Sequence, residues 1–65
     1  MPKGWRITVE YGLGAKAVVE VGLSDLIQAE AAAINHVGKG EAVVREALQD
    51  AEYERLSAAG KLIKA

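Results

Sequence analysis

The sequence has no cysteine and no phenylalanine, and only one proline, one histidine and one tryptophan among its 65 residues. Without cysteine the chain forms no disulfide and no thiolate metal site, which is typical of a reducing compartment, so we expect a cytoplasmic location. The single histidine, His36, precedes Gly38 at the end of a predicted helix, where a cap or the helix dipole explains it. No second group pairs with it, so we expect no enzyme activity, no metal and no cofactor.

Long apolar runs and an excess of either charge are also missing. No stretch is long enough to span a membrane, and no leader pattern precedes the first predicted strand, so we expect no membrane association and no processing. The net charge is −1, from eight basic and nine acidic residues, which creates no overall field for nucleic acid. At this length the chain is expected to be one small domain, residues 1–65.

Strict alternation of apolar and polar residues over residues 5–21 predicts an antiparallel β-hairpin. The inward side chains are expected to be Trp5, Ile7, Val9, Tyr11, Ala15, Ala17, Val19 and Val21. A loop at residues 12–14, with Gly14 in the left-handed region, pairs Trp5 with Val21 and keeps all of them on one face. Because this loop joins two strands rather than a strand and a helix, it is not a phosphate-binding loop.

The same register predicts charge pairing on the outward face of the hairpin. Arg6 then lies opposite Glu20, and Glu10 lies opposite Lys16. Each such pair is worth roughly 0.2–1 kcal/mol, so the charges favour the register that the apolar face requires.

Helical periodicity follows the hairpin and predicts two helices, at residues 24–37 and 40–58. Ser24 or Asp25 is expected to cap the first helix and Gly38 to end it. Its inward residues are predicted as Leu23, Leu26, Ile27, Ala31, Ile34 and Val37. Those of the second helix are predicted as Val43, Val44, Ala47, Leu48 and Ala51.

Gly60 is a stop signal, and the tail at residues 60–65 is expected to form either a short third strand on the hairpin edge or a disordered end. The fold class is therefore α+β, a hairpin followed by two helices (ββαα). Trp5 is expected to be largely buried against the helices, at Leu26, Ile27 or Val44.

These patterns favour a small non-enzymatic protein-interaction module, an inhibitor or adaptor of the kind found in phages and mobile elements, that binds a larger protein partner. An open strand edge can add to a partner's sheet. The region of Tyr53, Leu56 and Ile63, at the end of the second predicted helix and in the tail, is expected to supply an apolar anchor.

The segment GEAVVREAL at residues 40–48 resembles the start of the second helix of ribbon–helix–helix regulators and antitoxins. Residues 17–55 also resemble the strand–helix–turn–helix layout of that family. The resemblance implies the alternative function, a dimeric DNA-binding regulator whose paired strands enter the major groove.

Under that resemblance, Gly40 and Glu41 mark the phosphate clamp at the helix start, while Lys16 and Val18 face the bases. Phosphate contacts dominate DNA affinity, and here each outward lysine or arginine of the hairpin is matched by a glutamate. We therefore expect duplex DNA to be bound weakly or not at all at physiological salt, unless the protein is a ribbon–helix–helix dimer.

Overall fold

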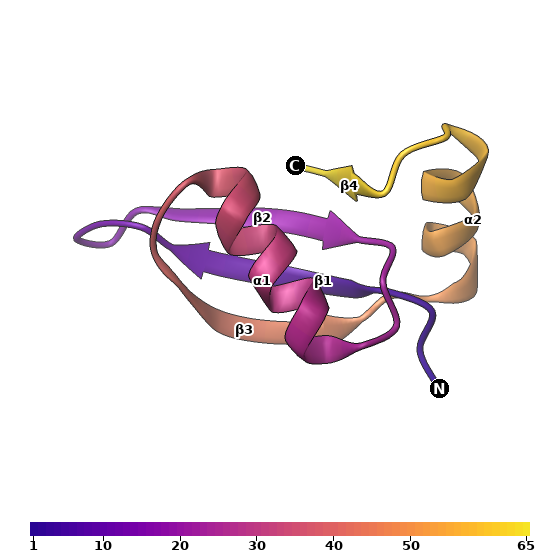
Figure 1. The fold of residues 1–65 in the computed structure, drawn as a ribbon, viewed down its shortest axis with the longest axis horizontal. Coiled ribbons are helices and arrows are strands. Elements are labelled where there is room, and N and C mark those ends of the chain that lie inside the picture. Colours follow the sequence, from indigo (N-terminus) through magenta and orange to yellow (C-terminus); the bar gives the residue numbers. More distant parts are fainter.

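A computed structural model describes residues 1–65 as four strands and two helices around one antiparallel sheet (Figure 1). The elements are β1 (Trp5–Glu10), β2 (Lys16–Val21), α1 (Leu26–Val37), β3 (Glu41–Ala47), α2 (Asp50–Ala58) and β4 (Ile63–Lys64). The strand order is β3-β1-β2-β4. α1 lies across one face of the sheet, and α2 lies at one end of it. The α+β class is confirmed, whereas the ββαα order is wrong because a strand separates the two helices.

The predicted hairpin is confirmed in register and in loop geometry. Trp5 pairs with Val21, Ile7 with Val19 and Val9 with Ala17, as the apolar alternation requires. The Tyr11 N–H donates to the Ala15 carbonyl at 3.0 Å and closes the loop. Gly14 occupies the left-handed region with φ of 75°, as expected.

The core lies between the inward face of the hairpin and α1. Its fully buried residues are Ile7, Val9, Val19, Val21, Ala29 and Ala33. Trp5 is only half-buried at the rim of this cluster, and its Nε1–H donates to the Ser24 carbonyl at 2.9 Å. Trp5 packs against the core without being fully buried, because the indole N–H needs a partner and finds it at the surface.

α1 begins and ends where the sequence predicts, but part of its predicted inward face is wrong. Asp25 caps it by accepting the Gln28 N–H at 3.1 Å, and Gly38 ends it in the left-handed region. Ala29 and Ala33 face the sheet, while Ile27 is 78% exposed. Small alanine side chains on the inward face let the helix lie close to the sheet, which turns Ile27 outward.

The predicted helix at residues 40–58 is wrong, because residues 41–47 form β3 and only Asp50–Ala58 is helical. β3 pairs with the edge of β1 that the hairpin leaves open. Gly40 leads into β3 with φ of 104°, and a Cβ there would lie 2.3 Å from the Glu10 carbonyl oxygen. The chain therefore turns tightly beside β1, and the β-branched Val43 and Val44 suit the strand that follows.

The tail forms a short strand, which is one of the two outcomes expected from the sequence. Ile63 pairs with Val21 and Lys64 with Glu20, so β4 lies on the hairpin edge. β3 is tied to α1 on the opposite edge of the sheet by an ion pair between Arg45 and Glu30. Neither helix has the length and apolar character needed to cross a membrane.

Candidate functional site

α2 is positioned at the end of the sheet by its own first turn and by one buried leucine. The Glu52 carboxylate accepts the backbone N–H of Gln49 at 3.0 Å, and the acidic residues of the first turn favour the helix dipole. Leu56, 3% exposed, points from α2 toward the sheet. A Cβ at Gly22 would lie 3.4 Å from the Leu56 Cδ2, so this glycine gives the leucine room.

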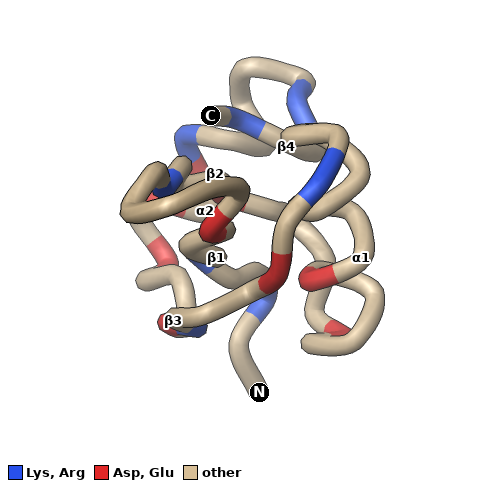
Figure 2. The backbone as a smooth tube through the Cα atoms, turned by 90° about the vertical axis from the view of Figure 1, so that its left-hand side faces the viewer, with Lys and Arg blue, Asp and Glu red and all other residues tan.

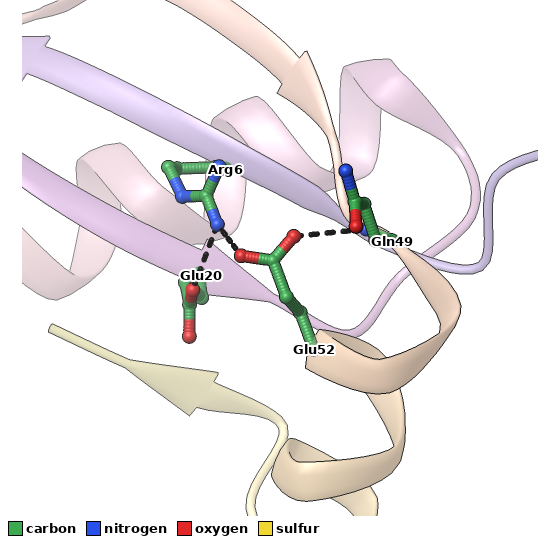
Figure 3. A network of polar contacts seen from close by, with 4 residues as sticks. All are labelled: Arg6, Glu20, Gln49 and Glu52. Atoms are coloured by element: carbon green, nitrogen blue, oxygen red, sulfur yellow. Dashed lines mark hydrogen bonds and ion pairs between the residues drawn. The ribbon is translucent and has the colours of Figure 1, made fainter.

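Arg6 joins the sheet to α2 through two carboxylates (Figure 3). Its Nη2 lies 3.3 Å from Glu20 on β2 and also contacts Glu52 on α2. The side chains of Arg6, Glu20 and Glu52 are 26%, 26% and 20% exposed. One guanidinium between two part-buried carboxylates removes their mutual repulsion and fixes where α2 starts.

We expect Arg6→Gln to destabilise the fold by about 1 kcal/mol, because both carboxylates then lose their partner. A double-mutant cycle with Glu52→Gln, followed by urea denaturation, measures the part that belongs to the Arg6–Glu52 contact. Arg55→Gln is the matched control, since Arg55 is exposed and has no carboxylate within 4.0 Å; its expected change is below about 0.5 kcal/mol. A cycle with no coupling between Arg6 and Glu52 would contradict this role.

A cleft opens between α2, β2 and β4, and we call it the corner cleft. It has a volume of about 260 Å³. Its lining residues are Glu20, Glu52, Arg55, Leu56, Ala59, Lys61 and Lys64. Leu56 and Ala59 are its apolar side chains, and the rest are charged.

The charges of the corner cleft are not balanced. Both of its carboxylates, Glu20 and Glu52, are paired with Arg6. Arg55, Lys61 and Lys64 are exposed, and none forms an ion pair within 4.0 Å. The free charge that a ligand meets in the cleft is therefore positive, although the whole chain carries a net charge of −1.

A second cleft, of about 310 Å³, lies beside the first and shares Leu56 and Lys61 with it. Its lining includes Tyr53, Gly22 and Leu62. Tyr53 is half-buried, and the Lys3 Nζ lies 5.6 Å from the centre of its ring. The two clefts are the surface hollows of the protein, and both lie at the corner between α2 and β4.

Comparison with known proteins gives no match. No protein-family model matches the chain, and no curated protein or solved structure is significantly similar to it. The geometry of the chain is therefore what bears on its function.

The predicted anchor residues at this corner differ in their burial and in the cleft that they line. Tyr53 lines the second cleft, and Leu56 is the buried floor of both rather than a half-exposed anchor. Ile63 is half-buried in β4 beside Val21 and lines neither cleft.

The residues named by the ribbon–helix–helix resemblance lie in two places. Lys16 and Val18 are exposed on β2, while Gly40 and Glu41 lie in the turn into β3 and at its first residue. The segment that carries the resemblance, residues 40–48, is mostly strand. The resemblance stays a prediction that the comparisons do not test.

Sequence reasoning missed the three free cations of the corner cleft. Arg55 comes from α2, Lys61 from the following loop and Lys64 from β4, so only the fold brings them together. One signal was present in the sequence: residues 55–65 contain three basic residues and no acidic one. In Figure 2 the chain leading into β4 accordingly carries basic residues without acidic ones.

Proposed function

We propose that the chain is a small non-enzymatic protein-interaction module, an inhibitor or adaptor of phage or mobile-element type, that binds an acidic segment of a larger protein at the corner cleft. One observation carries the proposal: Arg55, Lys61 and Lys64 surround an apolar floor and have no carboxylate partner. An acidic segment with an apolar side chain complements both features.

The cleft suits a protein segment better than a nucleic acid. Nucleic acid affinity grows with the number of phosphates neutralised, and here two carboxylates lie among three free cations. Leu56 and Ala59 give the floor an apolar contact for a side chain. Tyr53 in the neighbouring cleft is of the residue type that most often anchors protein interfaces.

The remaining parts of the proposal follow from the sequence. A non-enzymatic role fits a chain whose one histidine, His36, lies exposed in the last turn of α1. A cytoplasmic location fits the absence of cysteine. The DNA-binding alternative is tested in the same experiment as the protein partner.

The experiment is an NMR titration of the labelled protein with the probe peptide acetyl-Glu-Glu-Leu-Ser-Val-Val-Glu-amide. We expect shift changes that cluster at Arg55, Lys61 and Lys64 and affinity that falls as salt is raised. Lys64→Glu should weaken binding about tenfold. Lys39→Glu changes the net charge equally in the turn between α1 and β3, at the far end of the molecule from α2 (Figure 1), and should have little effect.

Two results would count against the proposal. Equal weakening by the two variants would mean that only net charge matters, and shift changes away from the corner would place the site elsewhere. A short palindromic duplex serves as the second probe. Tight, salt-sensitive binding of that duplex by a dimer, lost in Lys16→Ala, would favour the DNA-binding alternative.

A further inference from the structure

The two outer edges of the sheet differ in how they are protected. β3 forms one edge, and β2 is covered on its outer side by β4 at only two residues, Glu20 and Val21. An unpaired edge is a template for a further strand unless bulges or side chains block it.

Part of the β3 edge is protected by its own residues. A bulge interrupts its pairing with β1 between Thr8 and Val9. The Arg45 Nη2 donates to the Ala42 carbonyl of the same strand at 3.2 Å, which occupies that acceptor. Bulges and charged side chains are the devices that proteins use against edge pairing.

The β2 edge is open over a short stretch. In an antiparallel strand, alternate residues direct their backbone groups to opposite sides. The Tyr11 N–H bonds to the Ala15 carbonyl, and on the other side of β2 the Gly22 N–H bonds to the Leu62 carbonyl at 2.7 Å. The backbone N–H and C=O groups of the even-numbered residues of β2 therefore point to the outer edge of the sheet. Among these residues, Lys16 and Val18 are not covered by β4.

The side chains of Lys16 and Val18 fit a particular kind of strand. Both lie on the sheet face opposite α1, where Val18 is 49% exposed and Lys16 has no carboxylate within 4.0 Å. Val18 and Val44 flank Thr8 on this face, because Thr8 pairs with Val18 on one side and with Val44 on the other. An added strand that places an apolar residue beside Val18 and an acidic one beside Lys16 matches both.

A second copy of the chain suits this edge less well than a separate segment. Two-fold pairing of β2 with itself centred on Ala17 places Ala15 of the second copy beside Val19, next to the Glu20 that β4 already covers through Lys64. The short open stretch from Lys16 to Val18 and its unpaired lysine favour a separate extended segment that carries an acidic residue.

We infer that the acidic partner segment, whose binding at the corner cleft is the proposed function on which this inference rests, continues as a short strand added to β2 at Lys16 and Val18. Lys64 of the cleft is paired with Glu20, two residues along β2 from Val18. That spacing is roughly 7 Å in a strand, so one continuous segment reaches both sites. Main-chain bonds to Lys16 and Val18 then add affinity that does not depend on charge.

The test measures amide hydrogen exchange of the full chain with the same heptapeptide, acetyl-Glu-Glu-Leu-Ser-Val-Val-Glu-amide. Strand addition should slow exchange of the Lys16 and Val18 amides about tenfold or more at saturation. The peptide meets both requirements when it pairs antiparallel to β2 with its first valine beside Val18 and its last glutamate beside Lys16. In this register the N–H of the first valine donates to the Val18 carbonyl, and methylation of that nitrogen removes the donor. This methylation should weaken binding about tenfold.

A pair of variants separates the backbone bond from the side chain. Val18→Pro removes the outward N–H, whereas Val18→Ala keeps it and shortens the side chain. We expect Val18→Pro to lose about tenfold in affinity and Val18→Ala to bind nearly as the parent does, with both folded by circular dichroism. Equal binding by both variants would overturn the inference.

The readouts distinguish this inference from the proposed function. Shift changes at Lys61 and Lys64 without slower exchange at Lys16 and Val18 would overturn strand addition and leave the corner site standing. Absence of shift changes at the corner would overturn the proposed function itself.

Discussion

The Ile7→Ala variant is expected to lose most of the stability of the fold. Ile7 is fully buried in the central strand β1, between β2 and β3 and beneath α1. Truncating a buried isoleucine costs roughly 2–5 kcal/mol, because apolar burial is lost and a cavity remains. A domain of this size has a total stability of roughly 3–10 kcal/mol, so the variant removes a large share of it.

Urea denaturation followed by tryptophan fluorescence measures this loss, with Val44→Ala as the matched control. Val44 is on the neighbouring strand β3 but 45% exposed, so its truncation should change the free energy of unfolding by less than about 0.5 kcal/mol. Similar losses in the two variants would contradict the assignment of the α1-facing side of the sheet as the core.

The Gly40→Ala variant is expected to be the most damaging glycine substitution in the chain. A Cβ at Gly40 would lie 2.3 Å from the Glu10 carbonyl oxygen and 3.0 Å from the Tyr11 Cα, both backbone atoms. The φ of 104° adds strain for any residue with a side chain. We expect a loss of about 3 kcal/mol or more, since the turn must move away from β1.

Gly38→Ala is the control that separates strain from collision. Gly38 also has a positive φ, 98°, but a Cβ there has no neighbour within 4 Å. It should cost only about 1 kcal/mol by thermal or urea denaturation. If the two variants were equally destabilised, the close approach of the turn to Glu10 would not be what fixes β3 beside β1.

The hairpin was predictable because its signal is local and has a period of two residues. A slip of one position at Ile7 or Val19 moves the whole apolar set to the solvent face, so the alternation alone selects the observed register. The loop glycine Gly14 and the pairing of Arg6 with Glu20 agree with that choice. Local and tertiary preferences coincide in this segment.

The strand β3 was not predictable from residues 41–47 by themselves. Glutamates, alanines and Arg45 favour a helix there, and the valines fit an apolar stripe of either period. The decision is made by distant parts of the chain, namely the open edge of β1 and the close contact of Gly40 with Glu10. Tertiary pairing outweighs local helix propensity at this point.

The orientation of α1 and the composition of the corner cleft could not be predicted from the sequence, for related reasons. Several alanines around Ala29 and Ala33 make two faces of the helix almost equally apolar. The sequence pattern therefore predicted that the face with the larger Ile27 points toward the sheet. The three cations of the corner come from separate elements, and only the docking of Leu56 and the pairing of β4 assemble them. Tyr53 and Leu56, which were named from the sequence, line the clefts at this corner, but the sequence pattern did not indicate the charge there.

The most direct test of the central claim is site-specific photocrosslinking from the corner cleft in cells that produce the protein. A photoreactive residue at position 61 should capture a protein, and the crosslinked segment of that protein, mapped by mass spectrometry, should be acidic and extended. The matched position is Ile27 on the outer face of α1, 78% exposed, which should capture nothing specific. Capture only from position 27, or of a segment without acidic residues from position 61, would contradict the account.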